Sequence, residues 1–208
     1  MSNGVVFADI AGKYDRINKI LSLGRDQAWR HTVVDRLPQG RILDLGAGTG
    51  AANPIFAGRE VVALDPAPEM LALNEAPSRV VAVGERLPLA DGSFDAVFSA
   101  YVFRNLDSVP GTLAEIARVL RKGGKAGIVD LGRPQRPWAA RVHRLGSRIV
   151  LPTVGKLAGA PDEYRYLHES LDKLPPPDEM FRNGPLRLEA IWRMGPLGFV
   201  YGAVLVND

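Results

Sequence analysis

The stretch RILDLGAGTG, residues 41–50, decides the fold class of this chain. Its first half is a short apolar run, which is typical of a strand buried on both faces of a parallel sheet. Its second half has glycine at positions 46, 48 and 50. Glycine lets the backbone turn tightly and approach a ligand where a Cβ atom would collide. We therefore predict a buried strand that ends in a glycine-rich, ligand-binding turn.

Four similar apolar runs follow, and helical or turn-forming segments separate them. The runs cover Glu60–Asp65, Arg79–Val83, Phe94–Ala100 and Gly124–Leu131. Strands that alternate with helices predict an open, parallel α/β sheet with right-handed crossovers. The final stretch, LEAIWRM–GPLG–FVYGAVLV, predicts two more strands that form an antiparallel hairpin and close one sheet edge. The predicted fold is Rossmann-like, with seven strands and helices on both faces.

Helices are predicted from the spacing of the apolar residues. An amphipathic helix is expected around residues 10–21, a second over Arg25–Leu37, and a third over Thr112–Arg121, ended by Gly123-Gly124. After the glycine turn, Asn53 as N-cap with Pro54 in the first helical position predicts barely more than one helical turn.

Composition excludes several classes of protein. The chain has 208 residues, of which 46% are hydrophobic and 24% charged, as in a globular protein. It has no cysteine, so a disulfide scaffold, a thiolate zinc site and a cysteine nucleophile are ruled out, and we expect no metal site. The net charge of +3 is too small to suggest nucleic acid as a partner. No secretory signal is evident at the start, so we expect a cytoplasmic location.

An acidic residue near the glycine turn points to the kind of ligand. Asp65 ends the second predicted strand, nineteen residues after Gly46, where a carboxylate suits the hydroxyls of a ribose. The glycine spacing is GxGxG rather than the GxGxxG of dinucleotide folds, and the helix after it is too short to favour a pyrophosphate. These features favour a nucleoside cofactor without phosphate, such as S-adenosylmethionine.

The chain also resembles the class I S-adenosylmethionine-dependent methyltransferases and, more narrowly, the ubiquinone/menaquinone-biosynthesis C-methyltransferase family. The resemblance runs from about Phe7 to Pro177 and fades in the last 30 residues or so. The segments that carry it are KYDRINKILSLGRDQAW (13–29), YVFRNL (101–106), RVLRKGGKAGIVDLG (118–132), LPTVGKLAG (151–159) and YRYLHES (164–170).

The resemblance implies which residues contact S-adenosylmethionine. Val83 stands where the family has an Asp or Asn that reads the adenine amino group, so this task would fall to backbone groups or to Glu85. Ala100 stands where the family has a cofactor-contacting Ser. The implied cofactor-binding residues are Asp44, Gly46, Ala47, Gly48, Thr49, Gly50, Asp65, Pro66, Met70, Val83, Gly84, Glu85, Ser99 and Ala100.

The resemblance further implies methylation of a ring carbon next to a hydroquinone hydroxyl, with 2-demethylmenaquinol as the first candidate among polyprenyl quinols. Arg104 would stabilise the phenolate as a fixed positive charge, and Tyr14 and Asn105 would orient the hydroxyl. The proton acceptor stays open among Asp15, Asp130, His143 and His168. Two alternatives also stay open: an O- or N-methyltransferase of another small molecule, and a cofactor-binding protein without catalysis.

The segment after the fifth predicted strand suggests a membrane surface as a partner. Six basic and no acidic residues lie between Leu131 and Pro161, and apolar residues recur there at helical spacing from Trp138 to Ile149. A basic amphipathic helix is typical of peripheral contact with anionic lipid, here through residues 133–156 at the inner face of the membrane. A homodimer stays open. Along a single domain we expect a helical cap (1–37), a cofactor-binding core (38–131), an acceptor and lid region (132–180) and a closing hairpin (186–208).

Overall fold

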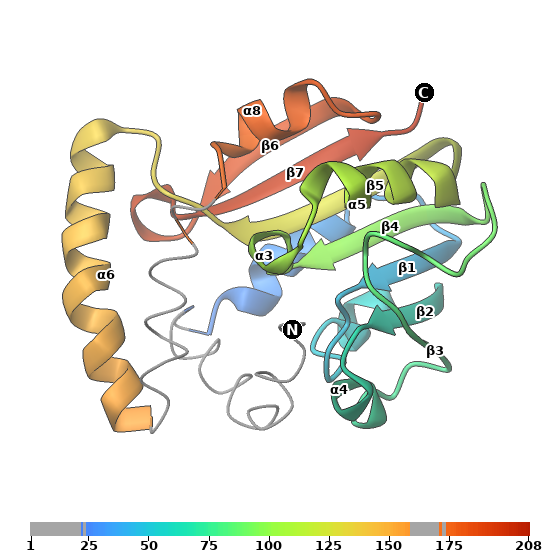
Figure 1. The fold of residues 1–208 in the computed structure, drawn as a ribbon, viewed down its shortest axis with the longest axis horizontal. Coiled ribbons are helices and arrows are strands. Elements are labelled where there is room, and N and C mark those ends of the chain that lie inside the picture. Colours follow the sequence, from blue (N-terminus) through green and yellow to red (C-terminus); the bar gives the residue numbers. More distant parts are fainter. Residues whose placement is uncertain (1–21, 23, 159–170, 172–173) are drawn as a thin grey trace.

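The computed structural model describes residues 22, 24–158, 171 and 174–208. Among them, seven strands form one sheet in the order β3-β2-β1-β4-β5-β7-β6 (Figure 1). The first five strands run parallel, and β7 runs antiparallel to both β5 and β6. The predicted sheet and its C-terminal hairpin are therefore confirmed. The strands are β1 (Arg41–Leu45), β2 (Glu60–Asp65), β3 (Ser78–Val81), β4 (Phe94–Ala100), β5 (Leu120–Leu131), β6 (Arg187–Met194) and β7 (Val200–Val206).

Helices cover both faces of this sheet, as predicted. Figure 1 shows α5 and α8 on one face and α3 on the other. The α-helices are α3 (Asp26–Val34), α4 (Pro68–Ala72), α5 (Val109–Val119), α6 (Pro137–Ala158) and α8 (Pro177–Arg182), and the short 3-10 helices are η1 (Asn53–Phe56), η2 (Phe103–Asn105) and η3 (Pro196–Gly198).

Alternating side chains along the central strands form two separate apolar cores. Leu43 of β1 and Val97 of β4 pack with Ile116 of α5 on one face. Their neighbours Ile42 and Phe98 pack with Val33 of α3 on the other. Because strands in the middle of the sheet bury both faces, they read as nearly continuous apolar runs, which is why the sequence located them well.

The predicted end of the helix at Gly123-Gly124 is wrong. The helix α5 ends at Val119, and both glycines lie inside β5, which starts at Leu120 rather than at Gly124. The pairing of β4 with β5 is irregular between Phe94 and Ala96, and Gly123, with φ of 76°, donates its N–H to the carbonyl of Asn207 at 2.6 Å. The glycine pair therefore forms a bend within the strand, where a side chain would be strained.

Smaller corrections concern single residues and boundaries. The strand β3 ends at Val81, so Val83 lies in the following loop. The turn after the glycine loop is short, as predicted, but Asn53 is its first residue and not its N-cap. The helix α3 is shorter than expected and ends at Val34. The helix expected around residues 10–21 and the segment 164–170 lie outside the described residues.

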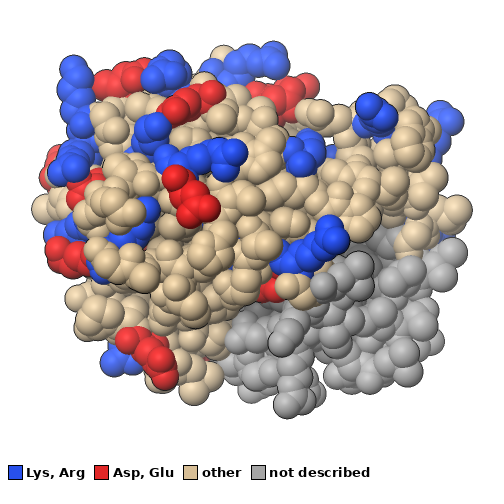
Figure 2. Space-filling model, turned by 180° about the vertical axis from the view of Figure 1, so that it is seen from behind, with Lys and Arg blue, Asp and Glu red and all other residues tan. Residues whose placement is uncertain are grey.

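The helix α6 stands at one side of the sheet (Figure 1). Ala139 is buried and His143 stacks on Phe199 with 5.4 Å between ring centroids, so these residues face the body of the protein. Trp138 and Leu145 are about three-fifths exposed, at 57% and 63%. Seen from behind in Figure 2, this end of the molecule shows basic side chains and no acidic ones among the described residues. Across the described ranges, no helix has the length and apolarity needed to cross a bilayer.

Candidate functional site

A cleft opens at the carboxyl ends of β1, β2 and β4, where the strand order changes direction. In open α/β sheets this is the position at which ligands bind. The cleft encloses about 990 Å³, a volume that includes space open to solvent. Its wall consists of Leu45, Gly46, Gly48, Leu64, Asp65, Pro66, Ala67, Met70, Val83, Gly84, Glu85, Ala100, Tyr101, Val102, Asn105, Leu106 and Asp107.

The glycine loop is held against the end of β2. The N–H groups of Gly46 and Ala47 both donate to the carbonyl of Leu64, at 2.7 and 3.0 Å. Gly46 has φ of 75°, and a Cβ atom placed on it would collide with the side chain of Val102. Both the backbone conformation and the space therefore require glycine at this position.

Asp65 ties the glycine loop to the neighbouring strand. One carboxylate oxygen accepts a hydrogen bond from the N–H of Gly48, and the other accepts one from the N–H of Ala67, each at 2.9 Å. Burial raises the pKa of Asp65 from its ordinary value, whereas these two hydrogen bonds lower it. A carboxylate oxygen has more than one acceptor position, so Asp65 can still receive the hydroxyls of a ribose in the cleft.

Asn74, which no sequence pattern singled out, also holds the glycine loop in place. Its amide nitrogen donates to the carbonyl of Gly48 at 3.1 Å, and its amide oxygen accepts from the side chain of Asn53 at 2.9 Å. The Asn74 side chain is almost fully buried. No motif marked it, because a single asparagine after a short helix looks like any turn residue.

Asp44 lies beneath the loop and not on the cleft wall. It is 2% exposed, and burial raises its pKa to about 7, against the opposing charge of Arg30. Arg30 is itself buried and pairs with Asp26 at 2.6 Å.

The end of β4 forms the wall opposite Asp65. Tyr101 has φ of 63°, a conformation that costs a non-glycine residue on the order of 1 kcal/mol. This bend places Val102 against Gly46 and brings Asn105 onto the cleft wall. Ser99, by contrast, is buried and donates its hydroxyl to the carbonyl of Leu45 at 3.0 Å, so only Ala100 of this predicted pair lines the cleft.

Arg104 points away from this cleft, into a buried ion pair. Its guanidinium lies 2.9 Å from the carboxylate of Asp130, and both side chains are almost fully buried. Asp130 also accepts the N–H groups of Phe103 and Leu131. Burial raises the pKa of Asp130, and Arg104 opposes that rise. The pair therefore fixes the turn η2, from which Asn105 reaches the cleft.

Arg104 also borders a second cavity, on the side of α8. The described residues around this cavity include Arg133, Arg193 and Tyr201. His143, one of the open proton acceptors, lies against Phe199 and within 3.3 Å of a guanidinium nitrogen of Arg133, away from the first cleft. The first cleft and this cavity thus lie on either side of η2.

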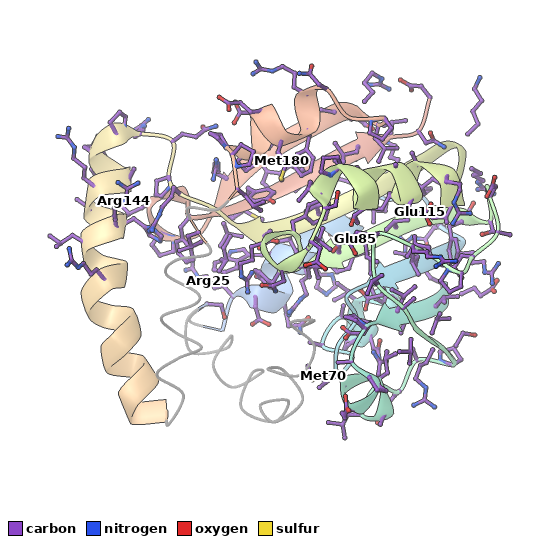
Figure 3. The ribbon with its side chains drawn as sticks, in the orientation of Figure 1. Arg25, Met70, Glu85, Glu115, Arg144 and Met180 are labelled. Atoms are coloured by element: carbon purple, nitrogen blue, oxygen red, sulfur yellow. The ribbon has the colours of Figure 1, made fainter. Side chains whose placement is uncertain are left out.

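Two loops form the end of the first cleft that lies away from the glycine loop. Val83, Gly84 and Glu85 follow β3, and Leu106 and Asp107 follow η2. Figure 3 shows that Met70 and Glu85 come from different elements, α4 and the loop after β3.

The cleft brings together most but not all of the predicted site residues. Those on its wall are Gly46, Gly48, Asp65, Pro66, Met70, Val83, Gly84, Glu85, Ala100 and Asn105. The predicted residues that are not on this wall are Asp44, Ala47, Thr49, Gly50, Ser99 and Arg104, and Tyr14 is outside the described residues. Among the described residues, no group of three His, Asp or Glu side chains is placed to hold a metal ion.

The sequence of this chain matches a family of known proteins. Residues 3–184 match the model of the ubiE/COQ5 methyltransferase family. A demethylmenaquinone methyltransferase of Thermus thermophilus is 36% identical, over 84% of this chain and 87% of the relative. The ubiquinone/menaquinone biosynthesis C-methyltransferase of Stenotrophomonas maltophilia is 34% identical, over 85% of this chain and 78% of its own.

The fold itself is shared more widely. A solved SAM-dependent methyltransferase from Thermotoga maritima superposes with a TM-score of 0.70 at 17% identity, and the match covers 98% of both chains. With the family model covering most of the sequence, the chain belongs to the ubiE/COQ5 methyltransferase family.

Proposed function

We propose that this protein transfers the methyl group of S-adenosylmethionine to a ring carbon of a polyprenyl quinol, and that 2-demethylmenaquinol is its acceptor. The named activities of the Thermus and Stenotrophomonas relatives support the acceptor class. The cleft supports the donor. The observation that carries the proposal is the hydrogen bond from the N–H of Gly48 to Asp65, which joins a carboxylate suited to a ribose to a glycine loop at the switch point of the sheet.

In this proposal the cofactor lies along the cleft in a fixed direction. Its methionine part faces the glycine loop and the end of β4, its ribose faces Asp65, and its adenine lies towards Met70 and the loop after β3. The predicted contacts of Asp44, Ala47, Thr49 and Gly50 then act through the loop that they support. The sulfonium supplies an activated methyl group, and the protein supplies position and a suitable electrostatic environment.

Asn105 is the residue best placed to orient the acceptor. It lies on the cleft wall next to Tyr101, on the turn that Arg104 and Asp130 hold. A phenol ordinarily has a pKa near 10, so a hydroxyl next to the reacting carbon gains reactivity if the site favours its ionised form. We propose that Arg104 contributes a fixed positive charge behind this turn, with its effect moderated by Asp130. Tyr14 remains a prediction for the same task.

The helix α6 supports a peripheral membrane contact, which a lipid acceptor would require. Trp138, Val142 and Leu145 are more than half exposed on its outer side, and Arg141 and Arg144 stand beside them. We propose that this face binds anionic lipid. Co-sedimentation of the protein with vesicles should then require anionic lipid. The bound fraction should fall several-fold in a double variant that carries Trp138→Ser and Leu145→Ser. Leu73→Ser, which alters an equally exposed apolar residue outside α6, is the control and should bind as the parent does.

The reaction is tested with S-adenosylmethionine carrying a labelled methyl group and chemically reduced demethylmenaquinone. We expect a product with a new carbon–methyl bond, identified by mass spectrometry after oxidation to the quinone. A methyl ether would instead indicate an O-methyltransferase. Cofactor binding without transfer to any quinol would indicate a binding protein without this activity.

A further inference from the structure

At the end of the cleft formed by the loops after β3 and η2, the sequence does not show which group would recognise the adenine. If S-adenosylmethionine binds as proposed above, its adenine amino group lies at this end and needs a hydrogen-bond acceptor. Val83 is 45% exposed on the wall and has no polar side-chain atom, and Gly84 has no side chain. From the sequence, backbone groups or Glu85 are expected to accept the hydrogen bond from the adenine amino group.

Glu85 binds the backbone of the opposite loop. One of its carboxylate oxygens accepts the N–H of Asp107 at 2.9 Å and the N–H of Ser108 at 3.1 Å. A Cβ atom on Gly84 would lie 3.1 Å from Thr112 and 3.3 Å from Leu106, so the two loops are packed closely together. Glu85 therefore joins the loops and fixes where Asp107 sits.

Asp107 is the other carboxylate at this end of the cleft. It is not used as a helix cap, because the hydroxyl of Ser108 caps α5 by accepting the N–H of Gly111 at 3.1 Å. Across the described residues, no hydrogen bond or ion pair of its side chain is found. Asp107 is exposed, lies on the cleft wall and is held by its own backbone N–H. Its carboxylate is thus available to a ligand without giving up another contact.

We infer that Asp107 reads the adenine amino group of the cofactor, in place of the acidic or amide side chain missing at position 83. A carboxylate accepts from an amino group but not from the 6-oxo group of hypoxanthine, which is itself an acceptor. The position therefore makes the enzyme discriminate between an adenosyl and an inosyl cofactor. The inference rests on the proposed use of S-adenosylmethionine, and it adds a specificity residue to that site.

The test compares the affinities of two product analogues, S-adenosylhomocysteine and S-inosylhomocysteine, by calorimetry. The parent protein should prefer the adenosyl compound by about tenfold or more, the size of one hydrogen bond to a charged group. In Asp107→Ala this preference should fall to within about threefold. Adding Val83→Asp to that variant should restore it, because a carboxylate then returns to the opposite loop. Thermal unfolding checks that each variant is folded.

Two controls separate the possible failures. Asp91→Ala removes an exposed carboxylate outside the cleft and should keep the full preference. The inference is overturned if a folded Asp107→Ala protein still prefers the adenosyl compound tenfold. It is also overturned if Glu85→Gln loses this preference while Asp107→Ala keeps it. If the parent binds neither compound, the proposed cofactor is wrong, which is a different result.

Discussion

The carboxylate of Asp65 accepts a hydrogen bond from the backbone N–H of Gly48 at 2.9 Å, across the gap between two neighbouring parallel strands. The two residues lie at the carboxyl ends of β1 and β2, which pair in register from Arg41 with Glu60 to Leu45 with Leu64. The sheet therefore brings the loop and the carboxylate to one place before any ligand binds. Such preorganisation lowers the entropic cost of binding.

Replacing the carboxylate of Asp65 should weaken cofactor binding and leave the protein folded. In Asp65→Asn, one of the N–H groups of Gly48 and Ala67 faces an amide NH₂ in place of an acceptor. We expect the Kd for S-adenosylhomocysteine to rise by about 10- to 100-fold, from the loss of charge-assisted hydrogen bonds. Calorimetry measures this change. Glu69→Gln, an exposed neighbour on α4, should bind normally; equal affinities of Asp65→Asn and the parent would contradict the assignment.

The contact between Gly46 and Val102 gives a second prediction. Gly46→Ala should destabilise the protein by about 2 kcal/mol or more, because the new Cβ collides with Val102 and the backbone has φ of 75°. Adding Val102→Ala should recover the part of this loss that comes from the collision. Urea unfolding of the parent, both single variants and the double variant measures the coupling. Strictly additive effects would show that the two residues do not meet.

Burial of Asp44 predicts a pH dependence of stability. Its pKa in the folded protein is about 7, against an ordinary value of 3.8. Between these values the folded protein holds a proton that the unfolded chain has released, so this contribution to stability is lost as pH rises from about 4 to about 7. The loss should amount to a few kcal/mol at most.

The variant Asp44→Asn isolates that contribution, because the amide does not titrate in this range. The free energy of unfolding of the parent, measured in urea, should fall more between pH 5 and pH 8 than that of the variant. Asp65 and Asp130 also have raised pKa values and are present in both proteins, so the variant should retain part of the slope. Identical slopes would mean that Asp44 is ionised throughout.

The ion pair of Arg104 with Asp130 predicts a large, non-additive effect. Arg104→Leu leaves a carboxylate buried without its counter-charge, which typically costs about 3–5 kcal/mol. Asp130→Asn in the same chain removes that charge and should restore part of the stability. The three variants and the parent form a double-mutant cycle in urea unfolding. A double variant as unstable as the sum of the single ones would argue against the buried pair.

The sequence predicted the sheet well because its signals are local. Buried parallel strands give apolar runs, and the GxGxG turn with Asp65 gives a fixed spacing, so both can be read without tertiary structure. The bend at Gly123-Gly124 could not, because it depends on the pairing of β4 with β5 and on a contact with Asn207. Local chemistry alone favoured a helix end there.

Side-chain roles that depend on partners far away along the chain could not be predicted from the sequence either. The sequence predicts a phenolate-stabilising role for Arg104, but it does not show that the guanidinium pairs with Asp130, 26 residues away along the chain. Asn74 and Asp107 carried no motif, because their positions depend on Gly48 and Glu85. Only the fold shows which carboxylates are already occupied by backbone groups.

In the proposed function, the cleft beside Asp65 holds S-adenosylmethionine. A crystal structure of the complex with S-adenosylhomocysteine is the decisive test. We expect both ribose hydroxyls within hydrogen-bonding distance of the Asp65 carboxylate, with the homocysteine end over the glycine loop. Density for the nucleoside elsewhere, or a cleft that stays empty at a saturating concentration, would contradict it.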